Sequence, residues 1–388
     1  MIARLLAVSL IWTLPAVSQV TGRFYLEKAQ FSPTEPVFVY LSVTNTGSEP
    51  IDMSPFDAEQ PMCSGVSFEL FKDGRQTNSC LLFSEKLCVM NGQFSKQVHL
   101  GPGQSHTDRY LLNYHHDLNV PGNYRLEAER TGFPGNRLQS VKATMLFRID
   151  AGAAPISSTE ILSWVNQLHS SDIYKRTEAA RTLASIAPPS IENTLFGFTD
   201  SSEFRRYSAL ALFRLHTPRS MEALAGLVRK GPPGSSEALE SAQYLARSGD
   251  QKWYPLLLEA AQKSPQIGYP TYAAELGGES SIAALVEMAN TSVEFDSGGR
   301  TNAIMALGST HSRIAVPVLL EFLRSGDEAT SDRAAYSLRV LTHRTAFADP
   351  QARDHNLEVI KWSEWWKREG RTARIYRDEE CVDPVPLP

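Results

Sequence analysis

The 388-residue chain has little excess charge of either sign and, after its first 20 residues, no long hydrophobic run. Its 38 Lys and Arg stand against 43 Asp and Glu, which leaves a formal net charge of −5 at pH 7. Without a cationic surplus to attract phosphates, a nucleic-acid partner is not expected. No later stretch approaches the roughly 20 apolar residues that cross a bilayer, so we expect no membrane insertion of the mature chain.

Cysteine is scarce, and the local motifs of common enzyme and metal sites are missing. The four cysteines are Cys63, Cys80, Cys88 and Cys381, and no C-x-x-C pair occurs. A zinc site is therefore not expected. The chain also lacks the G-x-S-x-G, P-loop, G-x-G-x-x-G and H-E-x-x-H motifs. We expect no catalytic residues, metal or cofactor, although an active site assembled from dispersed residues would leave no such motif.

One polar stretch, His115-His116-Asp117, carries groups that can bind a metal or shuttle protons. Adjacent strand or loop positions point apart, so a solvated turn is the favoured interpretation. The residues from Asp117 onward begin like a calcium loop, but Pro121 and Ala128 occupy positions where ligands are required. We therefore reject a calcium site.

The first 18 residues have the pattern of a secretory signal peptide. Arg4 precedes an apolar run, and small residues at Ala16 and Ser18 predict cleavage after Ser18. The alternative is a buried N-terminal helix. An exported chain would be periplasmic or extracellular, where an even number of cysteines favours disulfide bonds. Four cysteines allow three pairings, among which the sequence does not choose.

Residues 19–150 alternate apolar and polar side chains in short runs separated by turn residues. Examples are the runs 38–44, 66–71 and 124–130, and the turn residues Asp73-Gly74 follow the second run. About seven such strands predict an antiparallel β-sandwich. The step Gly122-Asn123-Tyr124 predicts a tyrosine corner, in which the phenol bonds to the backbone upstream.

Three turn motifs carry a family resemblance. The segments VTNTGSEPI (43–51), LGPGQ (100–104) and PGNYRL (121–126) make this part similar to bacterial immunoglobulin-like accessory domains. The same order of turns resembles the sandwich of the intracellular proteinase inhibitor family. That second resemblance implies an alternative function, protease inhibition by the β-sandwich, with the cysteine-bearing excursion from Ser54 to Met90 as its loop.

After a linker of small residues at 151–158, the hydrophobic period changes to that of helices and a repeated unit appears over residues 159–347. Each unit has small residues before an anchor leucine, and successive anchors are about 31 residues apart. A repeat of this length predicts stacked helix pairs. The anchors are Leu183, Leu212, Leu245, Leu276, Leu307 and Leu338.

The repeated unit resembles HEAT repeats, specifically the short class of the phycobilisome lyases. The resemblance implies an α-solenoid of about six helix pairs and not lyase chemistry, because the repeat is shared more widely than the activity. Arg176, Arg205 and Arg300 stand seven residues before their anchors, which predicts contacts between repeats. Residues 355–370, with three tryptophans on one face, predict a capping helix, and 371–388 an extended tail.

Helical phase predicts which side chains face outward from the second helices. Positions nine, five and two residues before an anchor, and two after it, point away from the core. These positions are rich in Tyr and Arg, the residues enriched at binding hot spots. Glutamates at 178, 203 and 240 equally fit a merely solvated face. We expect a non-enzymatic scaffold that binds a protein or peptide through Tyr174, Arg181, Tyr207, Arg214, Arg247, Arg333 and Tyr336.

Overall fold

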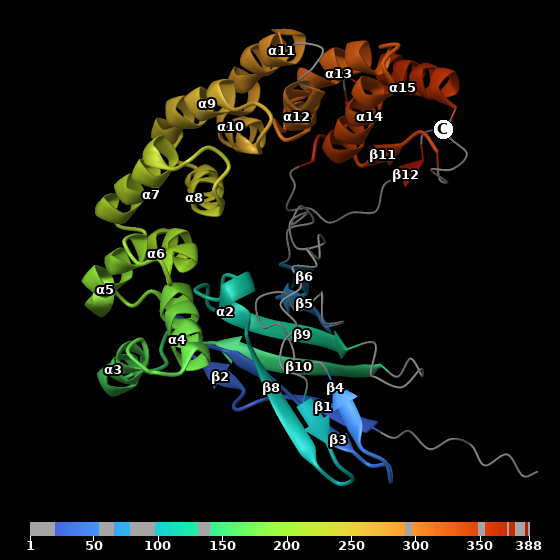
Figure 1. The fold of residues 1–388 in the computed structure, drawn as a ribbon. Coiled ribbons are helices and arrows are strands. Elements are labelled where there is room, and N and C mark those ends of the chain that lie inside the picture. The colour runs from blue at the N-terminus through green and yellow to red at the C-terminus, as the bar shows by residue number, and fades with distance from the viewer. Residues whose placement is uncertain are drawn as a thin grey trace, which may run out of the picture.

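The computed structural model describes most of the chain. The described residues are 20–53, 66–77, 98–130, 140–291, 297–347, 354–370, 372–376 and 385–386. The expected signal peptide and the four cysteines Cys63, Cys80, Cys88 and Cys381 lie outside these ranges. The structure consists of N-terminal strands in sheets, residues 20–149, followed by a helical region, residues 158–370 (Figure 1). We call these parts the β region and the helical array.

The β region contains two main sheets that share one apolar core. A three-stranded sheet has the order β1 (Val20–Leu26), β3 (Phe38–Asn45), β8 (Ser105–Leu111). A five-stranded sheet has the order β2 (Gln30–Phe31), β10 (Val141–Ile149), β9 (Gly122–Arg130), β5 (Val66–Lys72), β6 (Arg75–Gln76). β4 (Ile51–Met53) pairs with β7 (Val98–Leu100), and all pairings except that of β2 with β10 are antiparallel.

Period-two alternation explains the sandwich. In β3 and β9 alternate side chains are buried, because successive residues of a strand point to opposite faces. The expected tyrosine corner is present, since the Tyr124 hydroxyl donates to the Val120 carbonyl at 2.7 Å. Asp73 and Gly74, both at positive φ, form the two-residue turn between β5 and β6. This part of the excursion from Ser54 to Met90 is therefore a strand hairpin.

Successive helices of the array pack in pairs, and the second helix of each pair contacts that of the next. Their bounds are α3 (Ser158–Gln167), α4 (Ile173–Ile186), α5 (Glu192–Phe196), α6 (Ser208–Leu215), α7 (Pro218–Lys230), α8 (Ser236–Arg247), α9 (Tyr254–Lys263), α10 (Tyr269–Gly277), α11 (Ile282–Thr291), α12 (Ser297–Gly308), α13 (Ala315–Leu323), α14 (Glu328–Thr342) and α15 (His355–Glu369). The array forms an arc, with the even-numbered helices on its inner side (Figure 1).

The expected anchor leucines are buried, and the residues four positions after several of them share a backbone conformation. Every anchor leucine is at most 5% exposed. Four residues after their anchors, Ala187, His216, Gly249 and His311 all have a positive φ, and Ala187 and His216 are the left-handed C-caps of α4 and α6. Arg176 donates to Glu203 at 2.7 Å, and this contact joins α4 to the segment before α6, as expected for a contact between repeats.

The C-terminal end of the array is covered by α15 and part of the tail. Trp362 and Trp365 of α15 are 1% and 2% exposed, and the helix packs on α13. Tyr376 donates its backbone N–H to Leu341, and its ring stacks on His343 with centroids 4.1 Å apart. β12 (Val385–Pro386) pairs in parallel with β11 (Arg344–Thr345). No helix among the described residues combines the length and apolarity needed to span a bilayer.

Candidate binding surface on the inner face of the helical array

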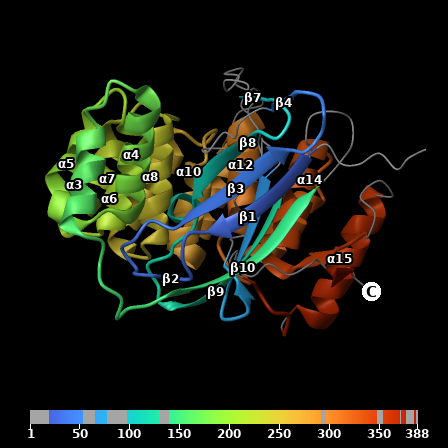
Figure 2. The ribbon, with the colours of Figure 1, turned by 90° about the horizontal axis from the view of Figure 1, so that it is seen from below.

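The β region lies inside the arc of helices (Figure 1). It contacts α4 and α6, so the β region and the helical array share an interface. Seen from below, α3 to α8 stand beside the sandwich and β1 and β3 lie in front (Figure 2). Phe38 and Leu111 of the β region share a core with Trp164 of α3. The Phe38 and Trp164 rings are 6.2 Å apart. Shared apolar burial therefore fixes one region on the other.

A guanidinium from the β region is held by this inner face. Arg109 of β8 donates to the carboxylate of Glu178 at 2.5 Å, five residues before the first anchor leucine. The same guanidinium lies over the rings of Phe38, at 4.8 Å, and Trp164, at 5.8 Å. Burial opposes a charged Arg109, but the bonds and charge of Glu178 outweigh it and raise the Arg109 pKa.

The second helix pair contacts the short helix α2 (Leu112–His115) and the residues after it, through α6. Arg214 of α6 donates to the carbonyls of Asn113 and His116, at 3.3 and 3.1 Å, and pairs with Asp117 at 2.6 Å. The ring of Tyr207 meets that of Tyr114 edge-on, with centroids 6.3 Å apart. Arg214 and Tyr207 are thus engaged within the chain.

This arrangement corrects three expectations of outward exposure. Tyr207 is 1% exposed, Arg181 is 6% exposed and the Arg214 side chain is 8% exposed, whereas helical phase predicted all three on an open surface. The physical reason is that α4 and α6 have neighbours on both sides, and at this end the β region covers the inner face as well. Helical phase measured from one leucine gives no information about the β region, which forms a third layer there. Tyr174, Arg247 and Arg333 are exposed, and Tyr336 is half-buried with Arg339 over its ring.

The expectation of a solvated turn at His115-His116-Asp117 is also wrong. These residues lie in the joint between the β region and α6, and only Asp117 is largely exposed. Burial lowers the pKa of His116 to about 3, with further contributions from His115 and Arg214. His116 is therefore neutral at physiological pH and contributes its carbonyl to the joint.

Further along the arc, α6, α8 and α10 carry a group that we call the inner-face cluster. Its aromatic members are Phe213, Tyr244 and Tyr272, and the Phe213 and Tyr244 rings stack with centroids 4.6 Å apart. All three pack on the main helical core. The charged members of the cluster are Glu240, Arg247 and Glu275.

The charge of Glu240 influences two tyrosines of the cluster. Burial raises the pKa of both Tyr244 and Tyr272 to about 12, and the charge of Glu240 contributes to both shifts. One carboxylate therefore lies near two hydroxyls from different helices. Burial also raises the pKa of Glu240 to about 7, with repulsion from Glu237 as the second cause.

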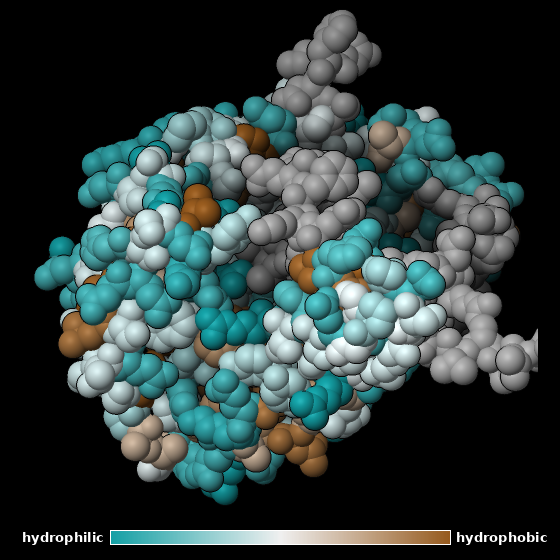
Figure 3. All heavy atoms as spheres, turned by 60° about the horizontal axis from the view of Figure 1, so that its bottom comes forward, coloured by the Kyte–Doolittle hydropathy of each residue, from teal (hydrophilic) through white to brown (hydrophobic). Residues whose placement is uncertain are grey.

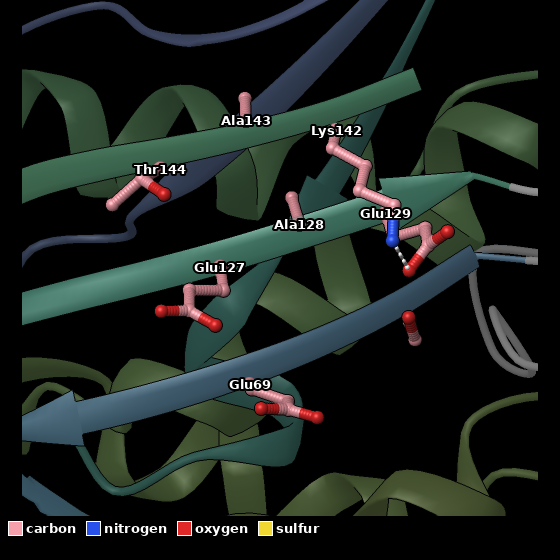
Figure 4. A pocket seen from close by; sticks show the side chains of 8 residues that line it. Glu69, Glu127, Ala128, Glu129, Lys142, Ala143 and Thr144 are labelled. Carbon is pink, nitrogen blue, oxygen red and sulfur yellow. Dashed lines mark ion pairs between the residues drawn. The ribbon is translucent and has the colours of Figure 1, made fainter. Parts of the chain in front are cut away.

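The outer face of the five-stranded sheet has a recess of about 290 Å³ (Figure 4). Carboxylates from β5 and β9 line it, and Glu129 pairs with Lys142 of β10 at 3.0 Å. Its side chains stand largely in solvent, and no buried polar group points into it. On the face shown in Figure 3, hydrophobic residues among the coloured atoms are scattered. Across the described ranges, no three His, Cys, Asp or Glu form a group that could hold a metal.

Comparisons with known proteins identify no family. No family model and no curated protein matches the chain. Two engineered proteins of known structure are 20% and 19% identical over 47% and 55% of this chain and 96% and 68% of theirs, each with a TM-score of 0.27. A β-glucosidase from Erythrobacter marinus is 15% identical over 32% of this chain and 15% of its own, with a TM-score of 0.17. At these scores the likenesses carry no argument.

Sequence reasoning missed Arg109, Tyr244 and Tyr272 as members of these surfaces. Tyr244 and Tyr272 stand one and four residues before their anchors, at positions that helical phase does not select as outward-facing. Only the fold shows that Arg109, 69 residues away in the chain, meets Glu178.

Proposed function

We propose that this protein is an exported, non-enzymatic scaffold that binds a protein or peptide segment on the inner face of its helical array. In this proposal the array is a solenoid of about six HEAT-type pairs, and the β region is an immunoglobulin-like sandwich docked on its first two pairs. Solenoids of this kind present extended concave surfaces to their partners. The export part of the proposal depends on the N-terminal signal pattern and the even number of cysteines.

One observation carries the proposal: inner positions that hold the β region in the first two pairs are matched further along by two exposed arginines. In the first two pairs, the inner positions Glu178, Tyr207 and Arg214 hold another part of the polypeptide. The equivalent positions in later pairs, Arg247 and Arg333, have no hydrogen bond or ion pair to any described residue. In the proposed solenoid, later pairs present the same kind of polypeptide-binding face.

Site-directed photo-crosslinking of the mature protein in its native compartment tests this proposal. A photoreactive residue replaces Arg247 or Arg333 on the inner face, and Glu222 on α7 or Glu364 on α15 as matched controls outside the arc. We expect both inner positions, and neither control, to crosslink to one partner, whose attached peptide mass spectrometry identifies. Equal labelling at all four positions, or no polypeptide adduct at the inner positions, would overturn the proposal.

A further inference from the structure

The first helix pair contains a complete example of how this surface holds a cation. The guanidinium of Arg109 is bound by one carboxylate, Glu178, and covered by the rings of Phe38 and Trp164. The carboxylate supplies charge-assisted hydrogen bonds, and the rings supply cation–π attraction. The occupant belongs to the same chain, so the contact is intramolecular here.

The third pair repeats the carboxylate at the same position. Glu240 stands five residues before its anchor, Leu245, as Glu178 does before Leu183, so both project from the same side of their helices. Glu240 is partly buried, and no described residue donates a hydrogen bond or forms an ion pair with its carboxylate. A carboxylate withdrawn from water without a partner is costly, which marks a vacancy for a donor.

Two tyrosines, one on α8 and one on α10, lie within electrostatic reach of Glu240. Tyr244 lies one turn after Glu240 on α8 and stacks on Phe213 of α6. Tyr272 comes from α10, the next helix of the inner row, which contacts α8. Negative charge also predominates nearby, because Glu237 and Glu275 accompany Glu240 while Arg247 is the near cation of α8. The neighbouring Arg214 already pairs with Asp117.

We infer that Glu240, Tyr244 and Tyr272 form a recognition site for a Lys or Arg side chain of the bound segment. This inference rests on the proposed function, since it names the chemistry of the partner at that surface. Arg247 supplies a second contact: it is the equivalent of Arg214, which binds backbone carbonyls and a carboxylate. Arg247 lies seven residues after Glu240, roughly 10 Å along α8. An extended segment covers that distance in about three residues.

Selection from a displayed library of random dodecapeptides on the full mature protein tests the inference. We expect selected peptides to be enriched in Lys or Arg, and Glu240→Gln to weaken them about tenfold, as for loss of a charge-assisted hydrogen bond. Replacing the basic residue of a selected peptide by norleucine should weaken binding to the wild-type protein by the same factor. The Glu240→Gln variant should bind the norleucine peptide no more weakly than the wild-type protein does. Glu364→Gln is the matched control, because Glu364 is an exposed glutamate of α15, and it should leave binding unchanged.

A charge exchange gives a second, positive readout. Glu240→Arg should reject the selected peptides and bind versions in which Glu replaces the basic residue. A library that yields no binders, or binders indifferent to both Glu240→Gln and norleucine, would overturn the inference. If crosslinks form at the inner face but the selected peptides bind regardless of charge, only the proposed cation site is overturned. If no crosslinks form at the inner face, the proposed function itself is overturned.

Discussion

At the scale of residues, the inner face uses one position for different contacts. The side chain five residues before the anchor is a carboxylate that binds Arg109, a phenol that meets Tyr114, or a carboxylate without a partner. Glu240 therefore differs from Glu178 in its electrostatics although the two share a place in the repeat. Burial and repulsion from Glu237 raise the pKa of Glu240 to about 7.

This raised pKa predicts a pH-dependent gain in stability for Glu240→Gln. The folded state holds the Glu240 proton more tightly than the unfolded state, whose carboxyl has a pKa of about 4.5. The Glu240 contribution to the free energy of unfolding therefore falls as pH rises from about 4.5 to 7, and it is constant above that range. Urea unfolding at pH 5 and pH 8 should show the variant gaining about 2 kcal/mol relative to wild type at the higher pH.

The Glu240 pKa shift has two causes, burial of the carboxylate and repulsion from Glu237 on the same helix. Tyr244 and Tyr272, on which the Glu240 charge acts in turn, stay protonated between pH 5 and pH 8 because burial raises the pKa of each to about 12. Glu364→Gln should show no such change. An equal response to pH in both variants would contradict the raised pKa.

At the scale of elements, each second helix is bounded by the two beside it, and the last one needs a substitute neighbour. At this end α15 packs on α13, and Tyr376 of the tail donates to the Leu341 carbonyl of α14. The indoles of Trp362 and Trp365 meet edge-on with centroids 5.5 Å apart beneath the surface. Their burial favours the capping interpretation of this helix over an aromatic ligand cage.

Trp362→Ala should destabilise the C-terminal pairs, since it removes a side chain that is 1% exposed. The expected loss is about 3–5 kcal/mol for a buried tryptophan. In hydrogen exchange, protection should fall in α13 and α14 and persist in α4 and α6, because each pair depends mainly on its neighbours. Trp366→Ala, at a half-buried position of the same helix, should cost less. Uniform loss of protection along the array would argue against a local cap.

At the scale of the whole molecule, the β region occupies the beginning of the inner face. The contact combines an apolar core around Phe38 and Trp164 with the polar joint at Arg214. The part of the inner face that is open to a partner thus begins near α8, where the contact with the β region ends. Phe213 of the inner-face cluster adjoins Arg214, which pairs with Asp117 of the β region.

Arg214→Ala should loosen this joint. The variant leaves the carbonyls of Asn113 and His116 without their donor, and it removes the ion pair with Asp117. We expect hydrogen exchange of residues 112–118 to quicken by about tenfold, corresponding to a charge-assisted bond, while α12 and α14 keep their protection. Arg333→Ala, an exposed arginine without a described partner, is the control. Unchanged exchange at 112–118 would show that the apolar core alone holds the joint.

The order of strands then helices, the tyrosine corner and the buried anchor leucines were all predictable from local patterns. Period-two alternation and a 31-residue repeat are properties of neighbouring residues in the chain. The candidate surface was only partly predictable. Arg247 and Arg333 face outward as helical phase predicts, but Tyr207 and Arg181 do not. The reason is that phase describes one helix, whereas their burial comes from neighbouring layers.

The sequence by itself determined which residues form strands and helices and which leucines are buried, because hydrophobic periodicity acts over a few residues. Only the tertiary structure decided what the inner face meets. Arg109 and Glu178 are 69 residues apart, and Arg214 and Asn113 are 101 apart. Such contacts depend on how the sandwich docks in the arc. The same docking occupies Glu178 and leaves Glu240, its equivalent in the repeat, without a partner.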